Sequence, residues 1–449
     1  MARKTDQLEE RCREIALEQG VDPDSRIERE GQRSWPAWCS YRDQARNERN
    51  TAAQAAADKA AMVMPQPEQY KDSPLTIIGN HEESTIAQMQ TCMKVGNVIA
   101  GAICADGHLG YAQPVGAVIA YEKQISISGV GFDIGCGNMA VKLDVPYSAV
   151  KDRANDILAE IRANISFGIG QTNDQLNDHE LFDDAAAWEN SGMKDYRQKA
   201  RAQLGTVGSG NHYIDLFRDE QDMVWIGVHF GSRGLGHTTA TRGLKMAGGK
   251  DGINVPPAVV DENSDIGQQY LSGMELAGRY AYAGREWVVE RVRKIIGGEV
   301  THTVHNHHNY AWRENHFGKE LWIVRKGATP TFPKQEGFVG GSMGENAVII
   351  EGMPENDTAK SLLFSTVHGA GRTMGRMAAK RAFTKDQMND WLKKAGVILA
   401  GGDLDESPMA YKRLTEVLVF HAPTIKIKHT LRPFAVAMAG PSEFDPWKD

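Results

Sequence analysis

The sequence has 449 residues, of which 41% are hydrophobic and 24% are charged, and its formal net charge is −7. Such a chain can bury a sizeable core, and its negative balance excludes a uniformly basic surface, so any site for a polyanion has to be a local basic pocket. The five cysteines are odd in number and unmatched in spacing, which argues against a disulfide framework and leaves Cys136 available as a thiolate ligand.

Residues 1–72 are predicted to form a helical extension that ends in a linker. Four apolar residues recur there at helical spacing: Leu8, Cys12, Ile15 and Ala16. The Ala-rich segment 51–64 also favours a helix, whereas segment 33–49 alternates arginine with aromatic residues. That alternation suits RNA binding, and it equally suits an aromatic anchor on the main domain. The start is charged and no apolar run approaches the roughly 18 residues of a membrane helix, so we expect a cytoplasmic protein without membrane contact.

Residues 73–449 are predicted to form one large catalytic domain. Short apolar runs separated by glycine predict buried strands at 75–79, 95–110, 117–123, 138–145, 212–217, 223–230, 320–327 and 346–352. Helices are expected at 150–165, 266–296 and 371–395. Because these elements show no regular strand–helix–strand repeat, we expect an α+β fold of mixed sheets with surrounding helices.

Five short stretches far apart in the chain combine glycine with Asp, Cys or His: 129–138, 208–215, 228–237, 304–310 and 365–372. Carboxylate, thiolate and imidazole together suit zinc, manganese, iron or cobalt. Taken alone, the pair Asp133 and Cys136 also fits a structural turn around a buried thiol. His212 at the start of one predicted strand and His229 at the end of another would alone fit core histidines. Their joint occurrence favours a metal centre.

Four histidines crowd into seven residues: His302, His305, His307 and His308. An HNH-type nuclease is disfavoured, because that fold is much smaller and needs a later His or Asn helix. Incidental metal binding by a His-rich tract is a second alternative. We expect one of the four to be a metal ligand and a neighbour to orient its ring.

His368 begins the small-residue turn HGAGR and is followed by Arg376, Lys380 and Arg381. Arginines on a helix after such a turn, together with backbone N–H groups, favour a phosphate pocket. An imidazole is also a competent phosphoryl acceptor. An ordinary helix start with a basic face is the alternative.

Together with RKGA at 325–328, Ser342 in GSMG and Tyr411 in AYK, these motifs resemble the RtcB family of RNA ligases over roughly residues 75–440. The resemblance implies a two-manganese centre, with Cys136 bridging the ions, on Asp133, Cys136, His212, His229 and His308. His308 is chosen because it directly precedes Asn309, as the family's ligand does.

The resemblance also implies a reaction. His368 would attack the α-phosphorus of GTP and release pyrophosphate, and the guanylyl group would pass to an RNA 3′-phosphate. A 5′-hydroxyl would then displace GMP, and a 2′,3′-cyclic phosphate would first be opened. The implied partners are RNA with these ends and a nucleoside triphosphate.

The implied nucleotide-binding positions are Asn211, His212, Tyr213, Ile214, Asp215, His308, Asn309, Gly340, Gly341, Ser342, Met343, Ala347, His368, Gly369, Ala370, Gly371, Tyr411 and Ala439. The implied phosphate- or RNA-binding positions are Arg233, Lys326, Arg372 and Arg376. The sequence departs from the family pattern at Asp215, Ala347 and Ala439, where the family has Glu, Ser and Lys. The departures point to an altered base pocket, with ATP a possible substrate beside GTP.

The leading hypothesis is therefore a manganese-dependent RNA ligase. Two enzymes are alternatives: a related nucleotidyltransferase that caps nucleic-acid ends or uses ATP, and a metal-dependent cyclic phosphodiesterase. A regulatory RNA-binding paralogue is disfavoured, since it would not need His368 together with all five ligands.

Overall fold

The computed structural model describes residues 4–27, 35–37, 41, 44–45, 70–173, 176–441 and 443. The chain divides into two compact units, residues 1–62 with 246–248 and residues 63–245 with 249–449. Most of the arginine- and aromatic-rich segment 33–49 and all of the Ala-rich segment 51–64 lie outside the described residues.

The described residues of the first unit include one long helix and a two-stranded ladder. Helix α1 (Lys4–Glu18) precedes strands β1 (Arg26–Ile27) and β2 (Trp35–Pro36), which pair antiparallel. On α1, Cys12 and Ile15 are fully buried and pack with Ala45. The helix predicted from their spacing is therefore confirmed.

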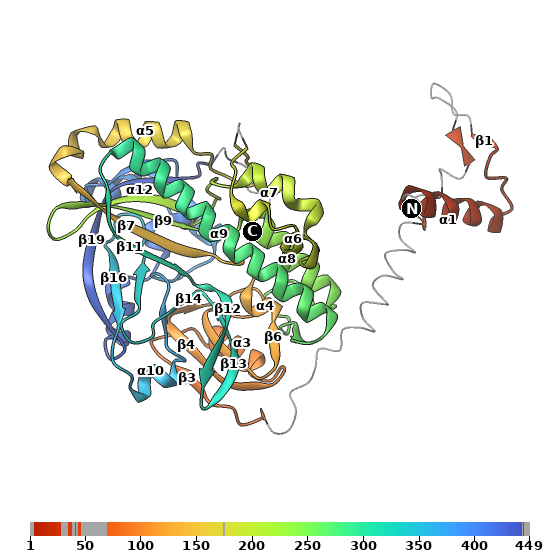
Figure 1. The fold of residues 1–449 in the computed structure, drawn as a ribbon, viewed down its shortest axis with the longest axis horizontal. Coiled ribbons are helices and arrows are strands. Elements are labelled where there is room, and N and C mark those ends of the chain that lie inside the picture. The colour runs from red at the N-terminus through yellow and green to blue at the C-terminus, as the bar shows by residue number, and fades with distance from the viewer. Residues whose placement is uncertain are drawn as a thin grey trace. The chain divides into compact units, whose positions relative to one another are not determined.

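The larger unit is built around a curled sheet with the strand order β11-β7-β9-β8-β19-β16-β15, and β18 pairs with β19 (Figure 1). Its strands are β7 (Gly137–Pro146), β8 (Tyr213–Arg218), β9 (Met223–Phe230), β11 (Val300–His307), β15 (Glu336–Val339), β16 (Ala347–Gly352), β18 (Ile398–Ala400) and β19 (Ile425–Met438). The two edge strands β11 and β15 contact each other, so the sheet bends back on itself. Apolar side chains fill its interior: Ala140, Phe217, Trp225, Val304, Phe338, Ala347, Ile349 and Leu431.

A second sheet has the order β12-β13-β5-β4-β3. Its strands are β3 (Leu75–Ile77), β4 (Val98–His108), β5 (Val115–Tyr121), β12 (Asn309–His316) and β13 (Lys319–Lys326). Two short ladders complete the strands, β6 (Gln124–Ser126) with β10 (Val259–Asp261) and β14 (Ala328–Pro330) with β17 (Ser365–Val367). Both main sheets mix parallel and antiparallel pairs, because β3–β4 and β18–β19 are parallel.

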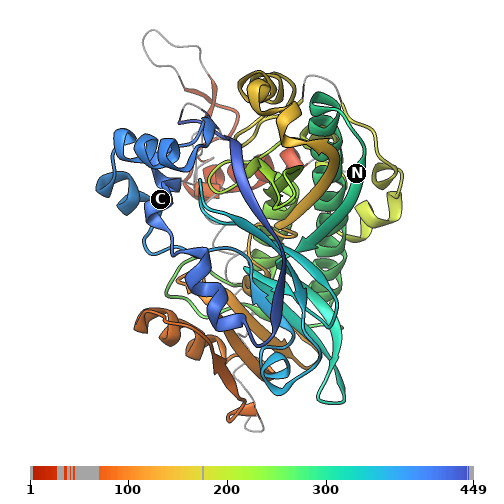
Figure 2. The same ribbon diagram turned by 90° about the vertical axis from the view of Figure 1, so that its left-hand side faces the viewer.

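Helices surround these sheets, and α9 packs against the strands β7 and β9 of the curled sheet (Figures 1 and 2). The helices are α3 (Glu83–Cys92), α4 (Ile127–Val130), α5 (Ala154–Asn164), α6 (Ala185–Asn190), α7 (Arg197–Gln203), α8 (Arg233–Met246), α9 (Asp265–Ile296), α10 (Asp357–Ser361), α11 (Arg376–Ala382), α12 (Lys385–Ala395) and α13 (Leu414–His421). No helix among the described residues is long and apolar enough to cross a membrane. The predicted α+β class of mixed sheets with surrounding helices is confirmed.

The helix predicted at 266–296 is confirmed, and the single helix predicted at 371–395 is wrong. α9 begins after Ser264, whose side chain accepts the N–H of Gly267. Residues 371–375 are not helical, and α11 ends at an extended Phe383. A capping box between Thr384 and Gln387 then starts α12 as a new helix. This local capping outweighs the helix propensity of the segment.

Phe338 tests the packing inside the curled sheet. Its ring is fully buried and meets Phe217 edge-on, with centroids 5.9 Å apart. We expect Phe338→Ala to lower the free energy of unfolding by about 3–5 kcal/mol, because a large cavity remains. Urea denaturation measures this loss. Phe317→Ala is the control, since its side chain is 58% exposed, and it should change stability by no more than about 0.5 kcal/mol. Equal effects would contradict this packing.

Candidate metal and nucleotide site

The candidate metal ligands meet because neighbouring strands carry them to one end of the curled sheet. Cys136 directly precedes β7, His229 lies near the end of β9, and His308 directly follows β11. The register pairs Gly137 of β7 with both Phe230 of β9 and His307 of β11. Antiparallel pairing thus places ligands that are far apart in sequence side by side.

The ligand atoms form two groups that share Cys136. Its Sγ lies 3.5 Å from His229 Nε2 and 3.8 Å from His212 Nε2, and His212 Nε2 lies 3.0 Å from Asp133 Oδ2. In each group, Cys136–His229–His308 and Asp133–Cys136–His212, the ligand atoms lie within 4.8 Å of one another. The thiol therefore stands between two candidate cation positions.

The donor chemistry fits metal binding. His229 Nδ1 donates to Asn138 Oδ1 at 2.7 Å, which leaves the Nε2 lone pair directed toward Cys136. Nδ1 of His212 and of His308 is buried without a hydrogen-bond partner in the described part of the chain. Burial lowers the pKa of His229 and His308 well below the usual range, so both rings are neutral ligands.

Charge in the cluster also suits cations. Burial alone would raise the pKa of Asp133, but the hydrogen bond and charge of His212 outweigh it and bring the pKa to about 2. Burial and the charge of Asp133 raise the pKa of the Cys136 thiol. A cation between these groups reverses that effect, because it takes the place of the thiol proton.

A cavity of about 280 Å³ adjoins the ligands. Its wall includes many residues that the sequence assigned to metal, nucleotide or phosphate: Asp133, Cys136, Asn211, Tyr213, Asp215, His229, His308, Asn309, Lys326, Gly340, Gly341, Ser342, Met343, His368, Gly369, Ala370, Gly371, Arg372, Arg376 and Tyr411. The predicted set therefore converges on one cavity. His212 lies in the metal cluster beside it.

Four expected residues lie elsewhere. Ile214 alternates with Tyr213 and Asp215 on β8, so its side chain faces the core beneath the sheet. Ala347 is fully buried inside the curled sheet, and Ala439 packs into the core that α5 and α9 cover. The guanidinium of Arg233 donates to Thr206 Oγ1 at 3.1 Å and to the Gly168 carbonyl at 2.7 Å, and Arg233 is not part of the cavity wall.

His368 enters the cavity just after β17, held by a buried carboxylate on β4. Its Nδ1 lies 2.7 Å from Asp106 Oδ2, and its backbone N–H donates to the same oxygen at 3.0 Å. Burial would raise the pKa of Asp106, but the charge and hydrogen bonds of His368 keep it below the usual value. An ionised carboxylate only accepts, so Nδ1 is the donor, and in the neutral ring the lone pair is on Nε2. The distance between the ring centroids of His368 and His308 is 4.8 Å.

Sequence reasoning missed Asp106, His108 and Glu406. The signal for Asp106 was a carboxylate inside an otherwise apolar predicted strand. A buried charge at such a position needs a partner. His108 lines the cavity, and burial lowers its pKa to about 4, so this imidazole is neutral. Glu406 is 4% exposed, which marks it as a paired charge.

Glu406 organises the two arginines of the cavity. Arg372 Nη1 lies 3.1 Å and Arg376 Nε lies 3.2 Å from its carboxylate oxygens. Tyr411 donates its hydroxyl to the same carboxylate and accepts from Arg372 Nη1 at 2.9 Å. The Arg372 guanidinium also lies over the Tyr411 ring, 4.9 Å from its centroid. A phosphate bound here would share both arginines with Glu406.

Asp215 presents an unmatched carboxyl to the cavity. Its Oδ1 is buried with no hydrogen-bond partner among the described residues, and burial raises its pKa well above the usual value. Burial therefore favours the protonated form of this carboxyl, which donates one hydrogen bond and accepts others. Such a side chain is suited to a ligand that presents both a hydrogen-bond donor and a hydrogen-bond acceptor.

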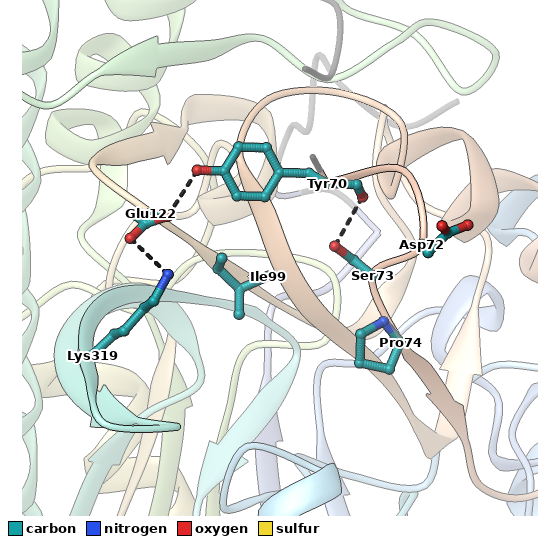
Figure 3. A pocket seen from close by; sticks show the side chains of 7 residues that line it. All are labelled: Tyr70, Asp72, Ser73, Pro74, Ile99, Glu122 and Lys319. Atoms are coloured by element: carbon teal, nitrogen blue, oxygen red, sulfur yellow. Dashed lines mark hydrogen bonds and ion pairs between the residues drawn. The ribbon is translucent and has the colours of Figure 1, made fainter. Parts of the chain in front are cut away.

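Another cavity, of about 420 Å³, lies where the described chain resumes at Tyr70 (Figure 3). Glu122 accepts the Tyr70 hydroxyl at 2.7 Å and Lys319 Nζ at 3.1 Å (Figure 3). These groups satisfy one another, and none of the candidate metal or nucleotide residues lines this cavity. These contacts tie Tyr70 to Glu122 and, through Glu122, to Lys319.

Substitution of the shared thiol tests the metal centre. We expect Cys136→Ser to lower metal affinity by on the order of a hundredfold or more, since even residues outside the first ligand shell typically contribute 10–100-fold. Elemental analysis of protein equilibrated with manganese measures the loss. Cys92→Ser is the control, because Cys92 is buried elsewhere and donates only to the Ala112 carbonyl. A wild-type metal count in Cys136→Ser would show that the thiol is not a ligand.

Comparisons with known proteins agree with this arrangement. The family model described as tRNA-splicing ligase RtcB matches residues 84–439. RNA-splicing ligase RtcB of Escherichia coli strain K12 is 30% identical, covering 74% of this chain and 88% of its own length. The tRNA-splicing ligases RtcB of Nanoarchaeum equitans and Archaeoglobus fulgidus are each 31% identical; they cover 79% and 76% of this chain, and 91% and 88% of their own lengths. The chain therefore belongs to the RtcB family, as the resemblance of its motifs predicted.

Proposed function

We propose that this chain joins RNA 3′-phosphate or 2′,3′-cyclic phosphate ends to 5′-hydroxyl ends, through a covalent His368–GMP intermediate and with two manganese ions. One observation carries the proposal. The His368 ring, held by Asp106, occupies the same cavity as the ligand cluster around Cys136. A nucleophile beside a metal site is the arrangement that nucleotidyl transfer to histidine requires.

The proton on His368 Nδ1 determines which atom reacts. Because Asp106 holds this proton, Nε2 is the nucleophile, and it attacks the α-phosphorus of GTP while the bond to pyrophosphate breaks. Asp106 then stabilises the positive charge that develops on the ring. An oxygen of the RNA 3′-phosphate next takes the guanylyl group from Nε2, and the RNA 5′-hydroxyl attacks that activated phosphate as GMP leaves. Bound manganese would neutralise phosphate charge and lower the pKa of an attacking hydroxyl.

Basic side chains on the wall support phosphate binding. Arg372 and Arg376 are already oriented by Glu406. Lys326 donates to the Tyr111 carbonyl at 2.6 Å, and burial lowers its pKa to about 8, so it remains largely protonated at neutral pH. These three cations lie in one wall of a chain whose net charge is −7, which fits a local polyanion pocket.

The base pocket supports a purine nucleotide, with GTP first and ATP as a competitor. Tyr213 and Tyr411 supply aromatic surface, and the Asp215 carboxyl and the Tyr213 hydroxyl are buried polar groups there without a partner among the described residues. Since Ala347 and Ala439 do not reach the cavity, selection between purines would rest mainly on Asp215. We further propose that residues 1–72 are an extension separate from the catalytic domain at 73–449.

Nucleotide labelling tests His368 and the nucleotide together. Wild-type protein with manganese and labelled GTP or ATP should form an acid-labile adduct, and His368→Ala should form none while it retains metal. His179→Ala, outside the cavity, should react as the wild type does. In equimolar competition we expect GTP to be preferred by no more than about tenfold, because one hydrogen bond is worth about 0.5–1.5 kcal/mol.

An adduct in His368→Ala would overturn the assignment of the nucleophile, and labelling by GTP alone would overturn the predicted selectivity. RNA carrying a 3′-phosphate and a 5′-hydroxyl separates the alternatives. A joined product supports the ligase. A stable nucleotide cap on the 3′ end without joining supports the nucleotidyltransferase, and opening of a cyclic phosphate alone supports the phosphodiesterase.

Asp106→Asn tests the carboxylate behind the nucleophile. The amide cannot stabilise the charged ring and favours the wrong tautomer, so the rate of adduct formation should fall by on the order of a hundredfold or more. Metal content should not change, because Asp106 is outside the ligand cluster. Asp219→Asn replaces another buried carboxylate, which accepts from Trp225 at 3.0 Å and lies outside the cavity. Equal rates in the two variants would contradict a specific role for Asp106.

A further inference from the structure

A fully buried arginine lies in the second half of α9, behind the metal cluster. Arg285 is 0% exposed, and its helix buries Ala281, Val288 and Val292 on neighbouring turns. Burying a guanidinium is unfavourable unless its donors find acceptors. Such a residue in an apolar helix face therefore indicates a specific set of bonds.

Those bonds converge on the strands that carry the ligands. Nη1 donates to the Gly135 carbonyl at 2.9 Å and to the Phe230 carbonyl at 2.6 Å. Nε donates to His305 Nε2 at 2.9 Å, and Nη2 lies 3.0 Å from His307 Nδ1. One planar group thus ties the start of β7, the end of β9 and the end of β11 together.

Three of these four partners are chain neighbours of a candidate ligand. Gly135 precedes Cys136, Phe230 follows His229, and His307 precedes His308. Resting on the proposed metal centre, we infer that Arg285 is a positioning residue, which fixes the spacing of Cys136, His229 and His308 from behind the sheet. It touches neither substrate nor metal, and it acts through the backbone that holds the ligands.

The guanidinium is suited to this role in a way that lysine is not. Its rigid fork lets one nitrogen bridge two carbonyls while the others reach two imidazoles, whereas an ammonium cannot span these directions. Within the described residues, no carboxylate lies within ion-pair distance of Arg285, and Glu286 on the same helix is 3.6 Å from His305 Nδ1 instead. Charge pairing therefore does not explain the burial of Arg285.

Cobalt binding distinguishes a positioning role of Arg285 from a contribution to stability alone. Full-length wild type, Arg285→Lys and Arg285→Met are titrated with Co²⁺ alone, and thiolate-to-cobalt absorption reports affinity and geometry. Val288→Ala is the matched control, because it removes core packing one turn along α9 without removing a hydrogen bond to the strands that carry the ligands. Thermal unfolding of each metal-free protein is measured in parallel.

We expect both Arg285 variants to bind Co²⁺ about ten- to a hundredfold more weakly, with an altered absorption band, as for other residues that support metal ligands. Val288→Ala should lose thermal stability and keep the wild-type affinity and band. Wild-type affinity and band in Arg285→Lys, with only reduced thermal stability, would overturn the inference.

If the Arg285 variants do not fold, His305 decides the question. His305→Leu removes the acceptor of Nε and should weaken Co²⁺ binding several-fold, while His305→Gln keeps an acceptor and should bind as the wild type does. Equal affinity of His305→Leu and wild type would then overturn the inference. A wild type that binds Co²⁺ but forms no nucleotide adduct contradicts the proposed function and leaves this comparison valid. A wild type without a thiolate–cobalt band contradicts both.

Discussion

The register of four antiparallel strands is the constraint on which the site depends. In the order β11-β7-β9-β8, Asn138 faces His229, which in turn faces Tyr213. A slip of one residue in any of these pairings would send its ligand to the opposite face, because side chains alternate along a strand. The apolar interior of the curled sheet fixes this register, since the same slip would expose Phe217 and Trp225. The same strand register therefore determines both the packing inside the sheet and the position of the candidate ligands at its end.

The chemistry also depends on how the two main sheets join. The chain passes from β11 of the curled sheet to β12 of the second sheet at His308. The His308 carbonyl accepts the N–H of Ala328, and Ala328 pairs with Val367 one residue before His368. Asp106, which holds His368, comes from the second sheet. Candidate metal ligands from one sheet therefore meet the proposed nucleophile, which the other sheet supports, in the wall of one cavity.

Much of this could be predicted from the sequence, because the signals were local. Apolar runs predicted the strands β3, β4, β5, β7, β8, β9, β13 and β16, and glycine-rich turns beside Cys136, His229 and His368 identified groups that converge. They did not predict β11 or the long β19. The partner of His368 is 262 residues away on β4, and no local pattern reveals such a pairing. The match of Ala347 to a family position likewise did not reveal which way its side chain faces. Side chains alternate along β16, and that of Ala347 lies inside the curled sheet. The break between α11 and α12 comes from the Thr384 cap, a local feature that outweighs the helix propensity of the segment.

Strand β19 has a consequence for synthesis. It covers one edge of β8, pairs with β16 and β18, and places Val436 and Met438 in the cavity wall. At a translation rate of roughly 5–20 residues per second, β8 and β9 would emerge at least about ten seconds before β19. During that interval the edge of β8 has no strand to pair with, and open edges recruit other chains. The nascent chain is thus exposed to misassociation until β19 is synthesised. A chaperone would be of most use during that interval.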